Sequence, residues 1–166
     1  MIVISDTSPI TNLAAIGYLD LLHQLYNSLI IPGAVYHELV NAQSDSVVPG
    51  AVEVQTLPWI QKRAVVDSQK VEEILANQTN IDRGEAEAIV LSMELNADLI
   101  LMDERRGRAL ASSYGIKVTG LLGILLQAKH QGAISTVKPL IDRLTVEAKF
   151  RISPQLYQTV LELAGE

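Results

Sequence analysis

The sequence predicts an α/β protein, a three-layer α/β/α sandwich with helices on both faces of a central parallel sheet. Two observations predict this fold class. Short apolar runs typical of buried strands alternate with helical patterns, as expected for βα units around a parallel sheet. In addition, two of these runs, Met1–Ser5 and Leu99–Met102, are each followed directly by an aspartate.

The length and composition favour a single domain. A chain of 166 residues can bury a core without disulfides or metals. We expect one domain over residues 1–166, with residues 134–166 as a helical extension packed on it. Cysteine is absent, which excludes disulfides, thiolate zinc sites and cysteine nucleophiles. We see neither a basic leader nor an apolar stretch of about 18 residues, and therefore expect a cytoplasmic protein with no membrane partner.

Residues 1–50 predict two strands and three helices. The strands are apolar runs, and Ser8 followed by Pro9 indicates an N-cap with proline at the first helical position. In chain order, these elements are Met1–Ser5, Ser8–Ala15, Leu19–Tyr26, Leu29–Ile31 and Pro32–Val40. The polar, turn-forming residues 41–50 then predict a mobile loop.

Residues 51–97 predict one strand and two helices. Val52–Leu57 alternates between apolar and polar residues like a strand, whereas residues 59–66 are ambiguous. Ser68–Ala76 has apolar residues on one helical face. After a break at residues 78–82, a 3.6-residue apolar period predicts a long helix that ends near Asn96.

Residues 98–166 predict two strands and four helices, the first of these helices ending at Gly115. In chain order, the elements are strand Leu99–Met102, helix Arg106–Tyr114, strand Ile116–Thr119 and helices Leu121–Gln131, Val137–Leu144 and Pro154–Leu163. The last helix carries an apolar stripe made of Leu156, Tyr157, Val160 and Leu163. Such a stripe packs on its own domain or helps to form a homodimer.

Charge is distributed unevenly along the chain. The formal net charge is −6, but residues 1–104 carry 4 basic and 15 acidic side chains, whereas residues 105–166 carry 9 basic and 4 acidic ones. A nucleic-acid surface on the basic part is one explanation. An ordinary solvated helical surface is the other.

Four acidic residues carry most of the functional signal. Asp6 and Asp103 each follow an apolar run, Glu85 lies where a helix begins, and Glu38 lies in the predicted helix Pro32–Val40. The carboxyl ends of parallel strands form the edge where α/β sheets bind ligands. Clustered carboxylates repel one another unless a cation neutralises them. Ligand sets made of oxygen alone favour Mg²⁺ or Mn²⁺ over zinc. The sequence therefore predicts a metal site that acts on phosphate.

Each acid also has a purely structural interpretation. Asp6 and Asp103 are placed to cap helices, and Glu38 is placed to be solvent-exposed. Asp82 and Glu85 have the spacing of a capping box, in which Glu85 reaches back to the Asp82 amide. Both roles put the Glu85 carboxylate at a helix N-terminus, so the sequence does not separate them.

Polar and basic residues accompany these acids. Glu104, beside Asp103, adds a carboxylate in reserve. The side chains of Thr7, Ser8 and Asn12 can orient the carboxylates or a metal-bound water. The arginines Arg105, Arg106 and Arg108 can contact phosphate or simply be solvated.

The pattern resembles the PIN domain, a metal-dependent nuclease fold that includes VapC-type toxin ribonucleases. The resemblance spans residues 1–133 and rests on Val3–Ser8, Pro32–Glu38, Glu85 and Asp103. Three segments are similar to a prokaryotic PIN-like subfamily of mostly unassigned function: Arg83–Ile89, Leu101–Arg106 and Val118–Ile124. Many PIN nucleases have Asp as the third acid and Thr two residues before the fourth, where this chain has Glu85 and Leu101.

The resemblance implies an Mg²⁺- or Mn²⁺-dependent endoribonuclease that cuts single-stranded RNA and leaves 5′-phosphate and 3′-hydroxyl ends. It implies that Asp6, Glu38, Glu85 and Asp103 hold the metal. A toxin role with an antitoxin protein as partner, and a homodimer, follow from the same resemblance. The alternatives are a non-catalytic PIN-like module that binds RNA or protein, and a phosphoacceptor receiver domain, which Ser5-Asp6 and Ile116–Val118 fit poorly.

Overall fold

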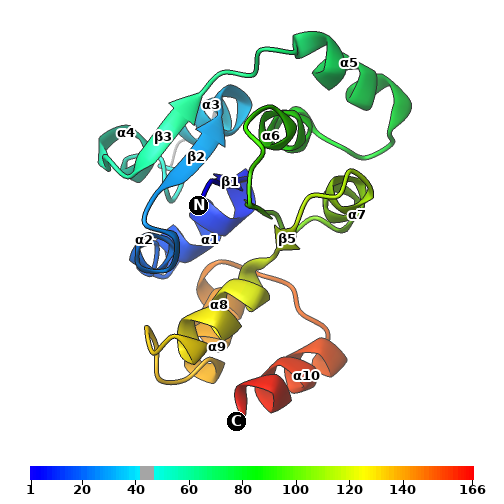
Figure 1. Cartoon of the computed structure of the whole chain (residues 1–166). Coiled ribbons are helices and arrows are strands. Elements are labelled where there is room, and N and C mark those ends of the chain that lie inside the picture. Colours follow the sequence, from blue (N-terminus) through cyan, green and yellow to red (C-terminus); the bar gives the residue numbers. More distant parts are fainter. Residues whose placement is uncertain (42–46) are drawn as a thin grey trace.

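A computed structural model describes residues 1–41 and 47–166 (Figure 1). Residues 42–46, which belong to the predicted loop 41–50, lie outside the described residues. The described strands form one parallel five-stranded sheet with the order β3-β2-β1-β4-β5. The strands are β1 (Val3–Ser5), β2 (Leu29–Pro32), β3 (Ile60–Arg63), β4 (Leu99–Leu101) and β5 (Val118–Thr119).

Helices cover both faces of this sheet, which confirms the predicted α/β/α sandwich. Successive strand side chains point to opposite faces, so Val3 and Leu101 join one core while Ile4 and Ile100 join the other. The helices of the first core are α1 (Thr7–Ala15), α2 (Asp20–Tyr26), α3 (Gly33–Val40), α4 (Glu53–Thr56), α8 (Leu121–His130), α9 (Lys138–Glu147) and α10 (Pro154–Ala164). Those of the second are α5 (Ser68–Asn77), α6 (Arg83–Glu94) and α7 (Arg105–Ser113).

The prediction of a strand over Val52–Leu57 is wrong. Its residues form the short helix α4, in which the Leu57 N–H donates to the Glu53 carbonyl oxygen at 2.9 Å. The third strand is instead β3, within the ambiguous residues 59–66. This strand lies at the edge of the sheet and buries only Ile60. Its exposed residues therefore give no apolar alternation that would identify a strand.

The first helix begins earlier than predicted. Asp6 is the N-cap of α1 and Pro9 is its third residue. Proline is tolerated there because the N–H groups of the first helical turn have no partner within the helix. Ser8, predicted as the cap, consequently lies inside the helix.

The predicted apolar stripe of α10 is divided between core and surface. Val160 is buried, and the Tyr157 hydroxyl donates to Asp142 at 2.8 Å. Leu156 and Leu163 are 46% and 72% exposed. Within the described ranges, no helix has the length and apolar character needed to cross a membrane.

The topology brings the first and fourth strands together at the centre of the sheet. The chain continues from β1 to β2 on one side and from β4 to β5 on the other, so the strand order reverses between them. Such a reversal opens a crevice at the carboxyl ends of the two strands. Asp6 and Asp103 follow these two ends, and the Asp6 N–H donates to the Leu101 carbonyl oxygen at 2.9 Å.

Candidate functional site

A cavity of about 340 Å³ lies at this carboxyl edge and is rich in carboxylates. Its acidic lining residues are Asp6, Glu38, Asp82, Glu85, Asp103 and Glu104, and its other lining residues are Thr7, Ser8 and Thr11. None of these described residues is basic. We call this hollow the acidic cavity. It brings together all four acids that the sequence singled out.

Asp6 and Glu85 are the buried members, at 6% and 4% exposure. Asp6 occupies the N-cap position of α1, but its carboxylate makes no capping hydrogen bond. The capping interpretation of this side chain is therefore wrong. Burial of a carboxylate that serves no cap is costly, which makes Asp6 the strongest candidate for a ligand to a cation.

Asp103 is held by hydrogen bonds to both of its carboxylate oxygens. Oδ1 accepts from the Leu121 N–H at 2.7 Å, at the start of α8, and Oδ2 accepts from the Ser8 hydroxyl at 3.1 Å. The Asn12 side chain donates to the Ser8 oxygen at 2.9 Å. Asp103 therefore does cap a helix, although this helix is α8 and not the α7 that follows it in sequence. These contacts fix the orientation of its carboxylate.

Glu38 is exposed on α3, as its structural interpretation predicted, but it also reaches the acidic cavity. Its Oε2 accepts from the Thr7 hydroxyl at 2.8 Å. The predicted orienting residues Thr7, Ser8 and Asn12 thus connect to two of the four acids.

Glu85 both caps its helix and lines the acidic cavity. Its Oε2 accepts from the Asp82 N–H at 2.8 Å, and Asp82 Oδ1 accepts from the Glu85 N–H at 2.8 Å, which completes the capping box at the start of α6. The two roles that the sequence left open are therefore compatible in space.

Burial raises the pKa of three acids of the cavity, Asp6, Glu85 and Asp103. Burial raises the pKa of Asp6 to about 8, and the nearby Asp82, Glu85 and Glu38 carboxylates act in the same direction. Burial likewise raises the pKa of Glu85 to about 7, with support from the Asp82, Glu104 and Glu38 charges. The pKa of Asp103 is also raised by burial, against its hydrogen bonds and Arg108. Asp6 therefore keeps its proton at neutral pH, and a bound cation would replace that proton.

The donor set fits a hard cation. Asp6 Oδ1, Asp82 Oδ1 and Glu38 Oε2 each lie 3.4 Å from the point where a Cβ on Gly84 would stand. Three carboxylate oxygens thus surround one small space that glycine leaves open. Among the described residues, no group of three or more such side chains is drawn together closely enough to hold an ion already. Ion binding would therefore require these side chains to move closer together.

Gly84→Ala tests this open space. We expect the added methyl group to weaken Mn²⁺ binding by about tenfold or more, because it stands among three carboxylate oxygens. We expect the metal-free protein to be about as stable as the parent, because the added Cβ would meet its neighbours at ordinary contact distances of 3.4 Å. Calorimetric Mn²⁺ titration and urea unfolding check the two effects. A variant that binds Mn²⁺ like the parent would show that the ion does not use this space.

The raised pKa values predict that the metal-free protein loses stability as the pH rises. Asp6 and Glu85 have folded-state pKa values of about 8 and about 7, above the ordinary 3.8 and 4.5. Between these limits the folded state binds more protons than the unfolded one. Its unfolding free energy therefore falls with pH, at about 1.4 kcal/mol per pH unit for each fully differential proton.

Urea unfolding in EDTA at pH 5.5, 6.5 and 7.5 measures this effect. We expect the steepest decline for the parent and a shallower one for Asp6→Asn, which removes one of the two groups. Parallel curves for the two proteins would contradict the assignment to Asp6.

Two members of the acidic cavity, Asp82 and Glu104, are not among the four acids that the sequence singled out as ligands. Asp82 was interpreted only as an N-cap, and Glu104 only as a reserve for Asp103. Both are exposed residues whose carboxylates reach the acidic cavity from the starts of α6 and α7. The clustering of acids at helix starts was the available signal, but its convergence depends on how α6 and α7 pack.

The three predicted phosphate-contacting arginines diverge. Arg108 Nη1 donates to the Met102 carbonyl oxygen at 3.0 Å, on the Asp103 side of α7. Arg106 Nη1 donates to the Thr79 hydroxyl at 2.9 Å. Arg105 is exposed. They therefore do not form one phosphate-binding cluster.

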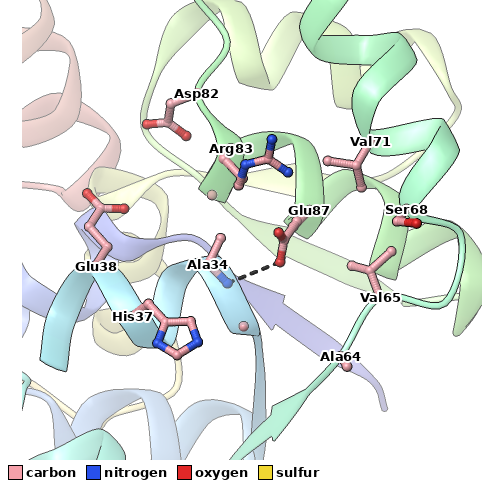
Figure 2. A pocket seen from close by; sticks show the side chains of 12 residues that line it. Ala34, His37, Glu38, Ala64, Val65, Ser68, Val71, Asp82, Arg83 and Glu87 are labelled. Carbon is pink, nitrogen blue, oxygen red and sulfur yellow. Dashed lines mark hydrogen bonds between the residues drawn. The ribbon is translucent and has the colours of Figure 1, made fainter. Parts of the chain in front are cut away.

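A larger hollow of about 800 Å³ adjoins the acidic cavity. Glu38 and Asp82 line both, and they lie at the end opposite Val65 and Val71 (Figure 2). Here Glu87 Oε1 accepts from the Ala34 N–H at 3.0 Å and so caps α3 (Figure 2). Glu87 lines this larger hollow and is not among the lining residues of the acidic cavity.

The fold and the acidic cavity define an α/β protein with a carboxylate site at the carboxyl edge of a parallel sheet. The chain belongs to the PIN domain family: the family DUF3368, described as a PIN domain, matches residues 2–166. PIN domains are generally nucleases and generally use divalent metal ions. This confirms the predicted family.

A solved structure supports the fold. A PilT N-terminus domain protein, SSO1118, from the hyperthermophilic archaeon Sulfolobus solfataricus P2 is similar with a TM-score of 0.56 and 18% identity. The match covers 77% of this chain and 93% of that chain. At this identity the likeness concerns the fold alone. No curated protein matches the sequence.

Proposed function

We propose that this protein is an Mg²⁺- or Mn²⁺-dependent endoribonuclease that cuts single-stranded RNA in the cytoplasm. The observation that carries the proposal is the convergence of six carboxylates on one small cavity, at the point where the strand order of the sheet reverses. A polyanionic substrate cannot approach such a site without cations. The same carboxylates are suited to hold these cations.

Asp6, Glu38, Glu85 and Asp103 would hold the metal, with Asp82 as a further candidate. The bound ion would supply an activated water and charge neutralisation at the scissile phosphate. Thr7 holds the Glu38 carboxylate, and Ser8 with the Leu121 amide holds Asp103. These bonds limit rotation of the two carboxylates, and so reduce the entropy lost when a ligand binds.

The test is a cleavage assay on end-labelled single-stranded RNA. We expect shortened products with a 5′-phosphate in Mg²⁺ or Mn²⁺ and no products in EDTA. Unchanged cleavage in EDTA would rule out the metal mechanism.

A non-catalytic RNA- or protein-binding module is the second candidate. It is favoured by the capping bond of Glu85 and by the separation of the acids in the described residues. RNA that is bound but left intact in both metals would favour it. A receiver domain is excluded by membership of the PIN family.

A toxin role with an antitoxin partner, and a homodimer, are parts of the same proposal. They rest on the resemblance to VapC-type toxins, and the exposed Leu163 of α10 offers apolar surface for a second protomer. Light scattering on the full chain and on a chain truncated after Arg151 tests the dimer. An unchanged dimer after truncation would exclude α10 as its interface.

A further inference from the structure

A third cavity, of about 490 Å³, lies on the other flank of Asp103 and has the opposite charge character. Its lining residues come from α7, β5, the start of α8, the segment between α9 and α10, and the start of α10. The lining residues that matter here are Asp103, Arg108, Phe150, Arg151 and Leu156. We call this cavity the arginine groove.

Charge distinguishes the three hollows that share lining residues with the acidic cavity. One of them has three carboxylates, those of Asp82, Glu85 and Glu104, and a single arginine, Arg106, which donates to the Thr79 hydroxyl at 2.9 Å. The one in Figure 2 is lined by three carboxylates, those of Glu38, Asp82 and Glu87. Its single arginine, Arg83, is paired with Glu72 at 2.8 Å. The arginine groove instead has two arginines and one carboxylate, Asp103. Among these hollows of the described residues, the arginine groove is the one in which arginines outnumber carboxylates, so it offers a polyanionic strand that leaves the acidic cavity the most favourable charge.

The backbone holds Arg108 and Phe150 at this groove. The guanidinium of Arg108 donates to the Met102 carbonyl oxygen at 3.0 Å and lies against Gly120, where any Cβ would overlap it. Lys149 has a left-handed backbone (φ 56°), and the next N–H, that of Phe150, donates to the Leu144 carbonyl oxygen at 3.0 Å. This turn ends α9 and directs Phe150 and Arg151 toward the groove.

The groove also offers an apolar surface of the kind that nucleobases use. Phe150 is the only phenylalanine of the chain and is partly buried, and Leu156 is 46% exposed. Aromatic side chains beside a basic groove bind single-stranded nucleic acid through stacking and phosphate contacts. The volume is within the range of small-ligand pockets.

We propose that the arginine groove binds a nucleotide of single-stranded RNA next to the scissile phosphate, with its base on Phe150 and Leu156 and its phosphate on Arg108 and Arg151. This inference rests on the proposed function, and it deepens it by giving the direction in which the strand leaves the acidic cavity. It also assigns a role to part of the basic C-terminal region.

Fluorescence anisotropy of a labelled single-stranded RNA, in EDTA and in Ca²⁺, tests the proposal, with the RNA checked to be intact afterwards. We expect Arg151→Gln to weaken binding by about three- to tenfold and to reduce the salt slope by about 0.7, because one phosphate contact is lost. Phe150→Leu should weaken binding by about tenfold without changing the salt slope. Lys149→Gln is the matched control, since it removes a neighbouring charge outside the groove, and its affinity should stay within about twofold.

Several outcomes overturn the proposal. They are a parent that binds no RNA in either buffer, equal losses for Arg151→Gln and Lys149→Gln, and unchanged RNA binding in both groove variants. Unchanged RNA binding in both groove variants would point instead to an acidic protein segment as the ligand of the groove. Arg151 is exposed, so its variant tests the groove even if Phe150→Leu proves less stable in a thermal melt.

The cleavage assay separates this inference from the proposed function. Groove-dependent binding without cleavage in Mg²⁺ or Mn²⁺ would support the groove and contradict the nuclease. Metal-dependent cleavage with parental RNA affinity in both groove variants would support the nuclease and contradict the groove.

Discussion

In the Asp6→Asn protein we expect RNA cleavage to fall by about 100-fold or more, because the loss of a metal ligand costs at least as much as the loss of a residue that only orients one. Asparagine keeps the shape of the side chain and one acceptor oxygen, so the buried position stays filled. It removes the charge that a cation would neutralise. Asp6 is the buried acid that makes no capping bond, and its contact with the Thr7 backbone N–H can be kept by the remaining oxygen of asparagine.

The same variant gives a second readout that does not depend on activity. In EDTA its unfolding free energy should equal or exceed that of the parent, most clearly at pH 8, where the parent carboxylate begins to ionise. With Mn²⁺ at a hundred times Kd, the parent should gain about 2.7 kcal/mol and the variant much less. Asp20→Asn, at an exposed position of α2, is the matched control. It should cleave RNA and gain stability from Mn²⁺ like the parent, and should lose at most about 1 kcal/mol in EDTA because Asp20 lies in the first turn of α2.

If Asp6→Asn cleaves RNA at the parental rate, or if EDTA leaves cleavage by the parent unchanged, the acidic cavity is not the catalytic centre. The non-catalytic binding module would then be the better interpretation. Loss of cleavage together with a large loss of stability in EDTA would instead indicate a structural role for Asp6.

The central strands could be predicted from sequence because they are buried on both faces. Val3, Ile4, Ile100 and Leu101 contribute to one core or the other, so their runs are continuously apolar. The edge strand β3 could not, because only Ile60 is buried. The other edge strand, β5, lies within the predicted strand Ile116–Thr119, so β3 was missed for its exposed polar residues and not for its edge position alone.

The acidic cavity was predictable in part for a related reason. Asp6 and Asp103 follow buried parallel strands, and the carboxyl ends of such strands must share one edge of the sheet. Asp82 and Glu104 are placed by the packing of α6 and α7, which no local pattern reports. The side-chain contacts, such as that of Asp103 with the Leu121 amide, join residues far apart in sequence and need the folded structure.

Glu85 is the acid whose role the capping box leaves open, and a pair of substitutions separates its two functions. Glutamine at position 85 keeps an oxygen that can accept from the Asp82 N–H, so Glu85→Gln preserves the cap but removes the charge. Alanine removes both. If Glu85 is a metal ligand, Glu85→Gln should lose about 100-fold or more of the cleavage rate. Its metal-free stability should hold or rise, since burial raises the pKa of this carboxyl to about 7.

Glu85→Ala should lose cleavage to the same extent and also lose about 1 kcal/mol of stability with the capping bond. Cleavage rates in Mn²⁺ and urea unfolding in EDTA, measured on both variants, give the comparison. If Glu85→Gln cuts RNA at the parental rate while Glu85→Ala is only destabilised, Glu85 is a cap and not a ligand. The metal would then depend on Asp6, Glu38 and Asp103, with Asp82 as the remaining acid whose oxygen lies beside the space left open by Gly84.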